Sequence, residues 1–191
     1  MIVNRLGLWA IAAIAGAAAL PARASCDDLA WQWVVDSCRR LADTYQNGSY
    51  ELLVSGYSYH VPATWTPERR AELNANAWGG GLGKTTEDGE GNNHTVYFLG
   101  FEDSHKHLQA QVGYAYTKFW GSRDGLQPGL GWTAAIVQRP DIFGGVPFPV
   151  VLPLFELRYG KAILTSTYIP TLNGGVNHGS TLYVFGRISL E

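Results

Sequence analysis

Three polar residues have types and positions that suit catalysis. His60 lies at the end of one segment of alternating character, and Asp103 and Ser104 lie at the end of another. A histidine can act as a general base, a serine as a nucleophile or oxyanion donor, and an aspartate can orient an imidazole. Adjacent strand residues point in opposite directions, so Asp103 and Ser104 can serve one site only if the chain turns there. Such a set suits chemistry at an acyl group. The alternative is that the three side chains cap strand ends.

The elements that must position these residues are strands. Eight segments have the alternation of strands and are separated by turn signals: Tyr50–Val61, Asn76–Thr86, His94–Asp103, His107–Trp120, Leu126–Gln138, Phe148–Tyr159, Lys161–Ile169 and Ser180–Leu190. In the fourth segment, one face is small or polar: Gln109, Gln111, Gly113, Ala115 and Thr117. The other face is mostly apolar: Ala110, Val112, Tyr114, Tyr116 and Lys118. That division is typical of the wall of a transmembrane barrel.

The fold that we predict is all-β. It is an eight-stranded antiparallel transmembrane β-barrel preceded by an amphipathic α-helix. An even number of antiparallel strands closes without a free edge. Eight strands leave a lumen wide enough for side chains or one slender ligand.

Residues 1–24 have the pattern of a signal peptide. Arg5 supplies the positive start, Leu6–Leu20 the apolar core, and Ala22-Arg23-Ala24 the small-residue cleavage site. We therefore expect export, with residues 25–191 as one domain of about 167 residues.

Composition narrows the class of protein. The leader holds two arginines and no acid, so 12 basic and 16 acidic residues remain, which gives no support to nucleic-acid binding. Charged residues make up 16% of the chain, against about 25% in soluble domains, and aromatic residues make up 13%. With export and period-two alternation, these values favour an outer-membrane barrel. The alternative is a soluble periplasmic barrel of the lipocalin kind.

The segment 27–46 differs from the rest because its apolar residues fall at helical spacing. They are Leu29, Trp33, Val34, Cys38, Leu41 and Tyr45, with Asp27 or Asp28 placed to cap the start. Together with Trp31, this pattern indicates an interfacial helix, and the alternative is a helix packed on a soluble core.

Cys26 and Cys38 are the only cysteines, in a portion where oxidation is expected. A continuous helix would hold their Cα atoms about 18 Å apart, beyond the roughly 7 Å limit for a disulfide. A disulfide therefore requires the chain near Cys26 to fold back, and the alternative is two thiols on one apolar stripe.

Strand parity then places the loops. With the helix and both termini on the periplasmic side, the first and third strands end at the external rim with His60 and Asp103-Ser104, and residues 62–75 form a long external loop. The alternation of His60 with Gly56 and Ser58 predicts that all three point toward the lumen.

The stretch Gly79–Thr85 looks like a phosphate-binding loop, but the required first glycine is replaced by Trp78. We interpret it as a glycine-rich wall strand. His105 and His107 alternate without an evident third ligand, so we expect no metal and no other cofactor.

Several motifs together resemble one family. They are Tyr57-Ser58-Tyr59-His60, Ala77–Gly83, Phe101-Glu102-Asp103-Ser104, Gly113-Tyr114-Ala115-Tyr116, Val146–Leu154 and Thr167-Tyr168-Ile169-Pro170. Their order and spacing resemble the outer-membrane lipid A palmitoyltransferases, the PagP enzymes, over essentially the whole segment after the leader.

The resemblance implies transfer of a palmitoyl or similar chain from the sn-1 position of a phospholipid donor to lipid A, among outer-membrane lipids, by a monomer with its catalytic rim facing outward. It implies that His60, Asp103 and Ser104 are catalytic and that Gly113 and Ala115 line the acyl pocket. It further implies that Pro153 and Pro170 flank a lateral lipid entry.

Departures from the family pattern bear on lipid access and on the pocket, and Glu191 stands where outer-membrane barrels commonly have an aromatic residue. Ser55 and Ala77 replace prolines at a second lateral opening, and Ala115 replaces a glycine at the floor of the pocket. Two other functions stay open: a lipid A deacylase on a similar barrel, and a passive structural or ligand-binding barrel.

Overall fold

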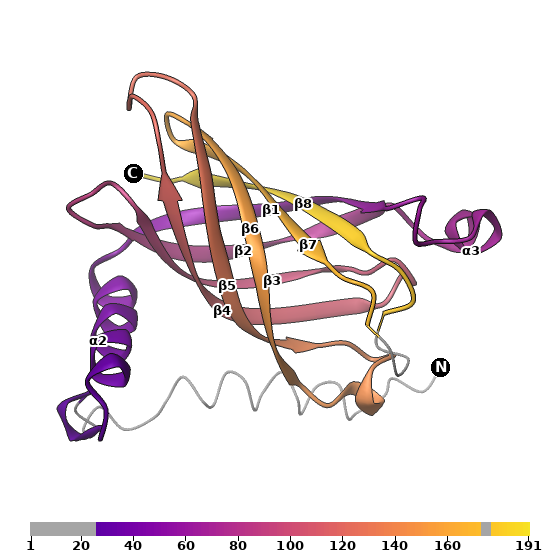
Figure 1. Ribbon diagram of the computed structural model, residues 1–191, viewed down its shortest axis with the longest axis horizontal. Helices are drawn as coiled ribbons and strands as arrows, with labels where there is room; N and C mark the ends of the chain where they lie inside the picture. The colour runs from indigo at the N-terminus through magenta and orange to yellow at the C-terminus, as the bar shows by residue number, and fades with distance from the viewer. Residues whose placement is uncertain (1–25, 173–176) are drawn as a thin grey trace.

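The computed structural model describes residues 26–172 and 177–191, so the expected signal peptide lies outside the described residues. Eight antiparallel strands form a closed barrel in sequence order (Figure 1). The strands are β1 Ser49–His60, β2 Asn76–Glu87, β3 Asn93–Glu102, β4 Leu108–Phe119, β5 Gln127–Gln138, β6 Phe148–Tyr159, β7 Ala162–Ile169 and β8 Thr181–Ser189. The predicted strand count and topology are confirmed, and each predicted boundary either coincides with the observed one or differs from it by a single residue.

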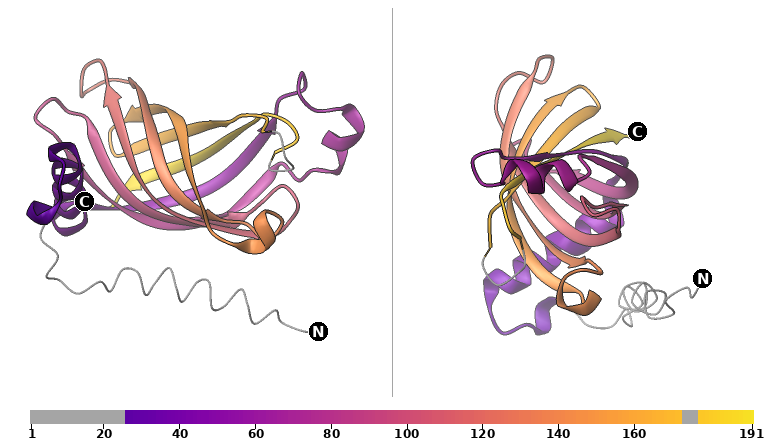
Figure 2. Two further views of the ribbon diagram at one scale, coloured as in Figure 1. Left: turned by 60° about the horizontal axis from the view of Figure 1, so that its bottom comes forward. Right: turned by 90° about the vertical axis from the view of Figure 1, so that its right-hand side faces the viewer.

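The barrel has two distinct ends (Figures 1 and 2). Helix α2, Gln32–Asn47, lies at one of them, which we call the helix end. The segments 61–75, 103–107 and 139–147 lie at the other, which we call the loop end, and the first of them contains the short helix α3, Pro67–Glu72. Among the described residues, no helix is both long enough and apolar enough to cross a membrane.

Glycines on the inner face of β2 make room for large side chains on β3. Gly79, Gly81 and Gly83 pair with Phe101, Leu99 and Tyr97 respectively. A Cβ added to Gly81 would lie 1.9 Å from the carbonyl oxygen of Phe98, so no larger residue fits there without a shift of the backbone. The glycine-rich stretch is thus part of the barrel wall, as predicted.

A β-bulge in β1 reverses the inward parity of that strand. The register shifts between Ser55 and Tyr57 against both neighbouring strands. Between the helix end and the bulge, the buried residues of β1 are therefore Glu51, Leu53 and Ser55. Between the bulge and the loop end, they are Ser58 and His60. The expectation that Gly56 continues the inward series of His60 was wrong, because Gly56 lies in the bulge.

Charged side chains fill the lumen near the helix end. Arg187 donates to Glu51 at 2.9 Å, to Glu156 at 2.7 Å and to Thr95 at 2.7 Å, and all four residues are buried. Arg158 forms a second layer through Gln127, Glu87 and Asn93. Because each guanidinium is paired with acceptors, the lumen is closed here by an ordered polar plug.

Helix α2 begins later than the sequence pattern suggests. Residues Cys26–Asp28 form a separate 3-10 turn, and the helix starts at Gln32 without a side-chain cap at Trp31. The expected helix start at residue 27 and the capping role of Asp27 or Asp28 were therefore wrong.

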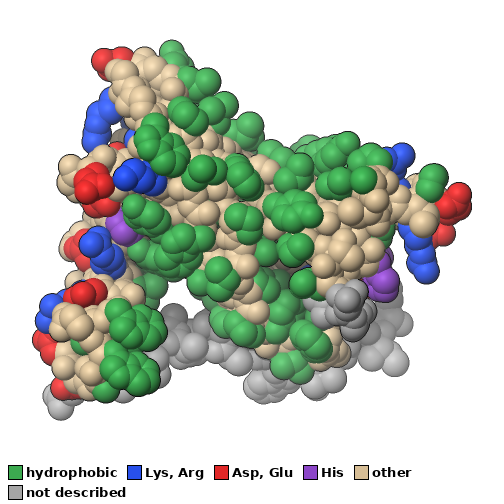
Figure 3. Space-filling view, in the orientation of Figure 1, with side chains coloured by type: hydrophobic (Ala, Val, Ile, Leu, Met, Phe, Trp, Pro, Cys, Tyr) green, Lys and Arg blue, Asp and Glu red, His purple; other side chains and the backbone are tan. Residues whose placement is uncertain are grey.

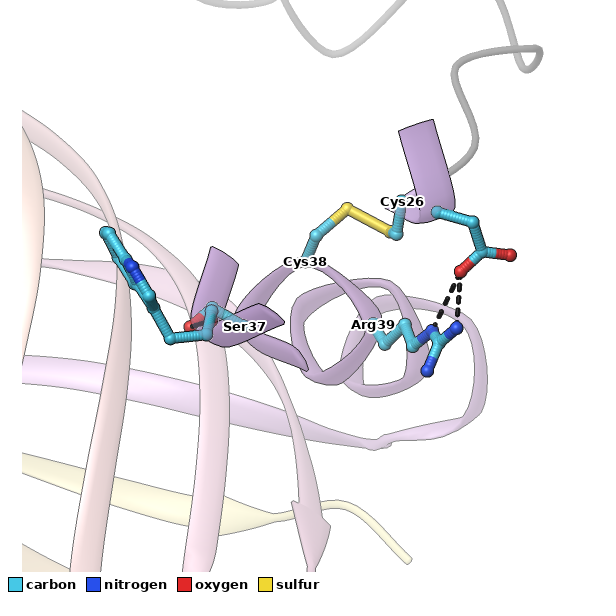
Figure 4. The surroundings of a disulfide bond; sticks show 6 residues. Cys26, Ser37, Cys38 and Arg39 are labelled. Carbon is cyan, nitrogen blue, oxygen red and sulfur yellow. Dashed lines mark hydrogen bonds and ion pairs between the residues drawn. A yellow bond between two sulfur atoms is a disulfide. The ribbon is translucent and has the colours of Figure 1, made fainter. Parts of the chain in front are cut away.

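The chain before the helix folds back on it, and this brings Cys26 within 5.6 Å (Cα to Cα) of Cys38 in a disulfide (Figure 4). Arg39, next to Cys38, donates to Asp27 beside the same bridge. The fold-back that a disulfide requires is thus present, and the two-thiol alternative is excluded.

Candidate active site

The side chains of His60 and Ser104 meet at the loop end. His60 is the last residue of β1, and Ser104 lies in the turn between β3 and β4. The imidazole Nε2 is 2.9 Å from the Ser104 Oγ. His60 is 5% exposed and packs edge-on against Trp65, with 5.6 Å between ring centroids. A neutral imidazole in this position can accept the hydroxyl proton.

Asp103 supports the turn that carries Ser104. One carboxylate oxygen accepts the backbone N–H groups of His105 and His107, each at 2.8 Å. The backbone N–H of Asp103 also donates to the carbonyl of His107, and Lys106 takes a left-handed φ of 63° to close the turn. Among the described residues, no hydrogen bond or ion pair joins Asp103 to His60. The turn that the sequence analysis required is present, and the Asp103 carboxylate bonds to this turn and not to the imidazole.

The second carboxylate oxygen of Asp103 points toward a charged cluster. This oxygen, Oδ2, is buried without a hydrogen bond among the described residues, and Arg139 lies 3.6 Å from it. Arg139 also donates to both oxygens of Asp141, at 3.1 and 2.8 Å. Burial would raise the pKa of Asp141, but the bonds from Arg139 outweigh it and lower that pKa. Arg139 follows β5 directly, and the sequence reasoning missed it because no motif marks it.

Asp103, His105 and Asp141 form the only described group with the composition of a metal site. One ligand atom from each lies within 4.8 Å of the others. The group includes His105 but not His107, so the two histidines that alternate in the sequence do not share a ligand set here. However, the Arg139 guanidinium already pairs with Asp141 and lies beside Asp103. These residues therefore fit the guanidinium cation of Arg139 better than a metal ion.

A cavity of about 550 Å³ extends from His60 and Ser104 into the lumen. Its walls are mainly apolar and aromatic: Leu53, Tyr97, Phe101, Ala135, Val150, Leu152, Leu154 and Phe185. It reaches Thr95, Glu156 and Arg187 of the polar plug. A long apolar slot with a polar pair at its mouth suits a ligand that has one reactive end and a hydrocarbon tail.

Gly113 and Ala115 both face this lumen on β4. Ala115 is 4% exposed, lines the cavity and pairs with Thr95 and Thr133. A Cβ on Gly113 would lie 2.9 Å from the hydroxyl of Tyr97. That hydroxyl is hydrogen-bonded to Thr133 at 2.8 Å. Sequence reasoning missed Tyr97 and Thr133, although both have the inward parity that could have identified them.

Pro153 and Pro170 lie where the barrel wall is least paired. The pairing of β6 with β7 runs from Tyr159 opposite Ala162 only to Leu154 opposite Thr167. Within the described chain, the Phe148–Pro153 half of β6 therefore has no partner on β7. Prolines cannot donate to a ladder and favour such unpaired edges.

The second lateral opening expected from the resemblance would lie between β1 and β2. There, Ser55 and Ala77 replace the prolines of the family pattern. The Ser55 hydroxyl contacts the Ala77 carbonyl and lies 2.6 Å from the hydroxyl of Tyr183. These contacts tie β1, β2 and β8 together at the level of the bulge.

Comparisons with known proteins agree with this geometry. A family model described as "Antimicrobial peptide resistance and lipid A acylation protein PagP" matches residues 40–187. A Lipid A acyltransferase PagP of Legionella pneumophila is 40% identical over 153 residues, which is 80% of each chain. One from Bordetella parapertussis is 37% identical over 170 residues, covering 88% of this chain and 91% of the relative. One from Methylobacillus flagellatus is 32% identical over 169 residues, covering 88% and 90%.

Proposed function

The chain belongs to the PagP family of lipid A acyltransferases, and we propose that His60, Ser104 and Asp103 carry its reaction. It transfers an acyl chain to lipid A. The observation that carries the site assignment is the 2.9 Å contact between His60 and Ser104 at the mouth of a long apolar cavity. In this proposal Asp103 acts by holding the Ser104 turn.

The donor in this proposal is the sn-1 ester of a phospholipid, with its chain in the cavity. His60 removes the proton of the attacking hydroxyl, the new acyl–oxygen bond forms, and the bond to glycerol breaks. The protonated imidazole then returns the proton to the departing glycerol oxygen. Ser104 acts in one of two ways. As the first attacking hydroxyl it forms an acyl-serine, from which a lipid A hydroxyl then takes the acyl group while the imidazole returns a proton to the serine oxygen. In a direct transfer the lipid A hydroxyl attacks the donor ester itself, and Ser104 donates to the oxyanion.

The β6–β7 seam is the proposed entry for lipid, beside Pro153 and Pro170. The half of this seam nearer the loop end is unpaired and lies beside the cavity. Pro170 is one of the residues that line the cavity. In the outer membrane, where PagP family proteins are found, the loop end then faces outward and the helix end faces the periplasm. We propose that one chain suffices, because the cavity is complete within it.

Helix α2 is proposed to lie at the periplasmic interface. Trp31 and Trp33 are 66% and 68% exposed, and their rings stack with centroids 6.2 Å apart. Exposed tryptophans of an amphipathic helix are favourable at the headgroup level of a bilayer.

The deciding experiment follows the acyl group in vesicles that contain labelled phospholipid and lipid A. Label that moves to lipid A, and is lost in His60→Ala and Ser104→Ala variants that remain folded, supports the proposal. Loss of a fatty acid from lipid A, with no label gained by it, would instead identify a lipid A deacylase. Unchanged transfer in both variants would overturn the site assignment.

A further inference from the structure

A second cavity, of about 700 Å³, lies outside the barrel at the helix end. It is bounded by α2, by the turn between β2 and β3, and by the outer faces of β4 and β5. Tyr114 and Trp132 line it and point away from the lumen, since their neighbours Ala115 and Thr133 point inward. This cavity is therefore separate from the catalytic one and opens on the outer surface of the wall.

One side of the cavity is polar and carries both signs of charge. The Arg40 guanidinium lies 3.4 Å from the His94 imidazole, and within the described chain it forms no ion pair. Asp88 and Glu90 lie on the adjoining turn. Burial would raise the pKa of Asp88, but hydrogen bonds from Asn92 and from the backbone of Glu90 outweigh it and lower the pKa to about 2. The cavity thus presents the Arg40 guanidinium, whose remaining donors have no partner among the described residues, beside two carboxylates. Asp88 is also bonded to Asn92, and Glu90 lies 3.9 Å from Lys118.

The other side is apolar and continuous with the outer surface of the barrel. Leu41 and Trp132 line the cavity and are 47% and 43% exposed. On the same outer face of β5 as Trp132, Leu130 and Ile136 are also exposed. In Figure 3, green apolar side chains cover the wall, whereas charged side chains gather at the helix end on the left. The cavity lies where these two surfaces meet.

We propose that this cavity binds the head group of one zwitterionic aminophospholipid from the leaflet at the helix end. Arg40 pairs with the phosphate through its free donors. The ammonium group lies near Asp88 and Glu90, and the upper part of the acyl chains packs on Leu41 and Trp132. An anionic phospholipid is disfavoured because its uncompensated negative charge would face two carboxylates.

The experiment measures lipid retention by delipidated protein in detergent, using native mass spectrometry. The probes are diether phosphatidylethanolamine and diether phosphatidylglycerol at equal concentration, because ether lipids cannot donate an acyl chain. We expect one phosphatidylethanolamine per chain to be retained in preference to phosphatidylglycerol. Arg40→Gln should weaken this retention about tenfold, the loss expected for one charge-assisted contact.

Arg39→Gln is the matched control. It removes the same charge from the adjacent position of the same helix, but Arg39 is bonded to Asp27 away from the cavity. Lipid held inside the barrel is common to all three proteins, so it cancels in the comparison. Near-ultraviolet circular dichroism verifies that each variant is folded.

Three results would overturn the proposal. Equal retention of the two lipids by the wild type would mean that the cavity does not recognise a head group. Retention by Arg40→Gln equal to that of the Arg39→Gln control would remove Arg40 from the site. If detergent displaced both lipids completely, the cavity would bind apolar chains without recognising a head group. Acyl transfer is assayed separately, so failure here leaves the catalytic proposal standing.

Discussion

The imidazole of His60 and the hydroxyl of Ser104 lie 2.9 Å apart, although β2 separates the two strands whose ends carry them. The contact is possible because β1 and β3 both end at the loop end of the barrel (Figure 1), and because Ser104 lies in the turn that follows β3. Asn74, in the long segment after β1, donates from its backbone to the carbonyl of Ser104 at 2.9 Å and links the two elements.

His60→Ala and Ser104→Ala should each lower acyl transfer by at least about a hundredfold, the lower range for loss of a general base. Both residues lie at the end of the barrel away from the polar plug, so the barrel should keep its resistance to heat in detergent. Transfer rates with labelled phospholipid and heat-shift gels measure the two properties. A folded His60→Ala protein with near-normal transfer would contradict the assignment.

Asp103→Asn should retain far more activity than Asp103→Ala. An asparagine oxygen can still accept the N–H groups of His105 and His107, whereas alanine releases the turn that holds Ser104. We expect a loss of about tenfold or less for Asp103→Asn and about a hundredfold or more for Asp103→Ala. Steady-state rates compare the two. Equal, severe losses would mean that the carboxylate charge itself is required.

Replacing Trp31 and Trp33 with alanine should ease extraction of the protein from membranes or lower its thermal stability there. Both side chains are exposed on the helix and do not line the catalytic cavity. Turnover in stable micelles should therefore stay close to that of the wild type. Loss of turnover with unchanged thermal stability would refute an anchoring role.

Ala115 should control the length of the acyl chain that is selected. Each buried methylene contributes about 0.8 kcal/mol, and forcing an extra one into a packed site costs about 1–3 kcal/mol. Palmitate is the first expectation, with a somewhat shorter chain as the alternative. Ala115→Gly should shift the preference toward longer donors, and Ala115→Met toward much shorter ones. Competition among donors of different length measures this, and an unchanged profile in both variants would show that Ala115 is not the floor.

Arg187→Met should destabilise the barrel strongly without touching the reacting residues. Arg187 is 3% exposed and pairs with Glu51 and Glu156, so its loss leaves two buried carboxylates unpaired. Breaking such a pair typically costs about 3–5 kcal/mol. The control is Arg123→Met, which removes an exposed ion pair with Glu87 and should cost about 1 kcal/mol or less. Urea unfolding in lipid vesicles compares the two, and equal free energies of unfolding would exclude a structural role for the plug.

Much of the barrel could be predicted from the sequence, because the signals are local. Period-two alternation defines both the position of a strand and the face that each side chain takes. The strand bounds, the antiparallel order and the lumen face of Ala115 therefore agree with the structure. The motifs around His60 and Ser104 also indicated the protein family, and the comparisons confirm that family.

Other features were decided only by the tertiary structure, because they depend on contacts between segments far apart in the chain. The bulge at Gly56 depends on the register of β1 against two neighbours, so alternation alone gave the wrong parity there. The disulfide forms because the chain around Cys26 folds back onto helix α2. Helical periodicity gives no information about this fold-back.

Asp103 illustrates the same limit within the site. The sequence suggested that Asp103 could orient the His60 imidazole. In the structure its carboxylate bonds to its own turn and faces Arg139, a residue 36 positions away. The sequence by itself determined which polar residues reach the loop end, because strand parity and strand length are local properties. Which of them touch one another was decided by barrel closure, since only the closed barrel brings the turn after β3 beside β1 and β5.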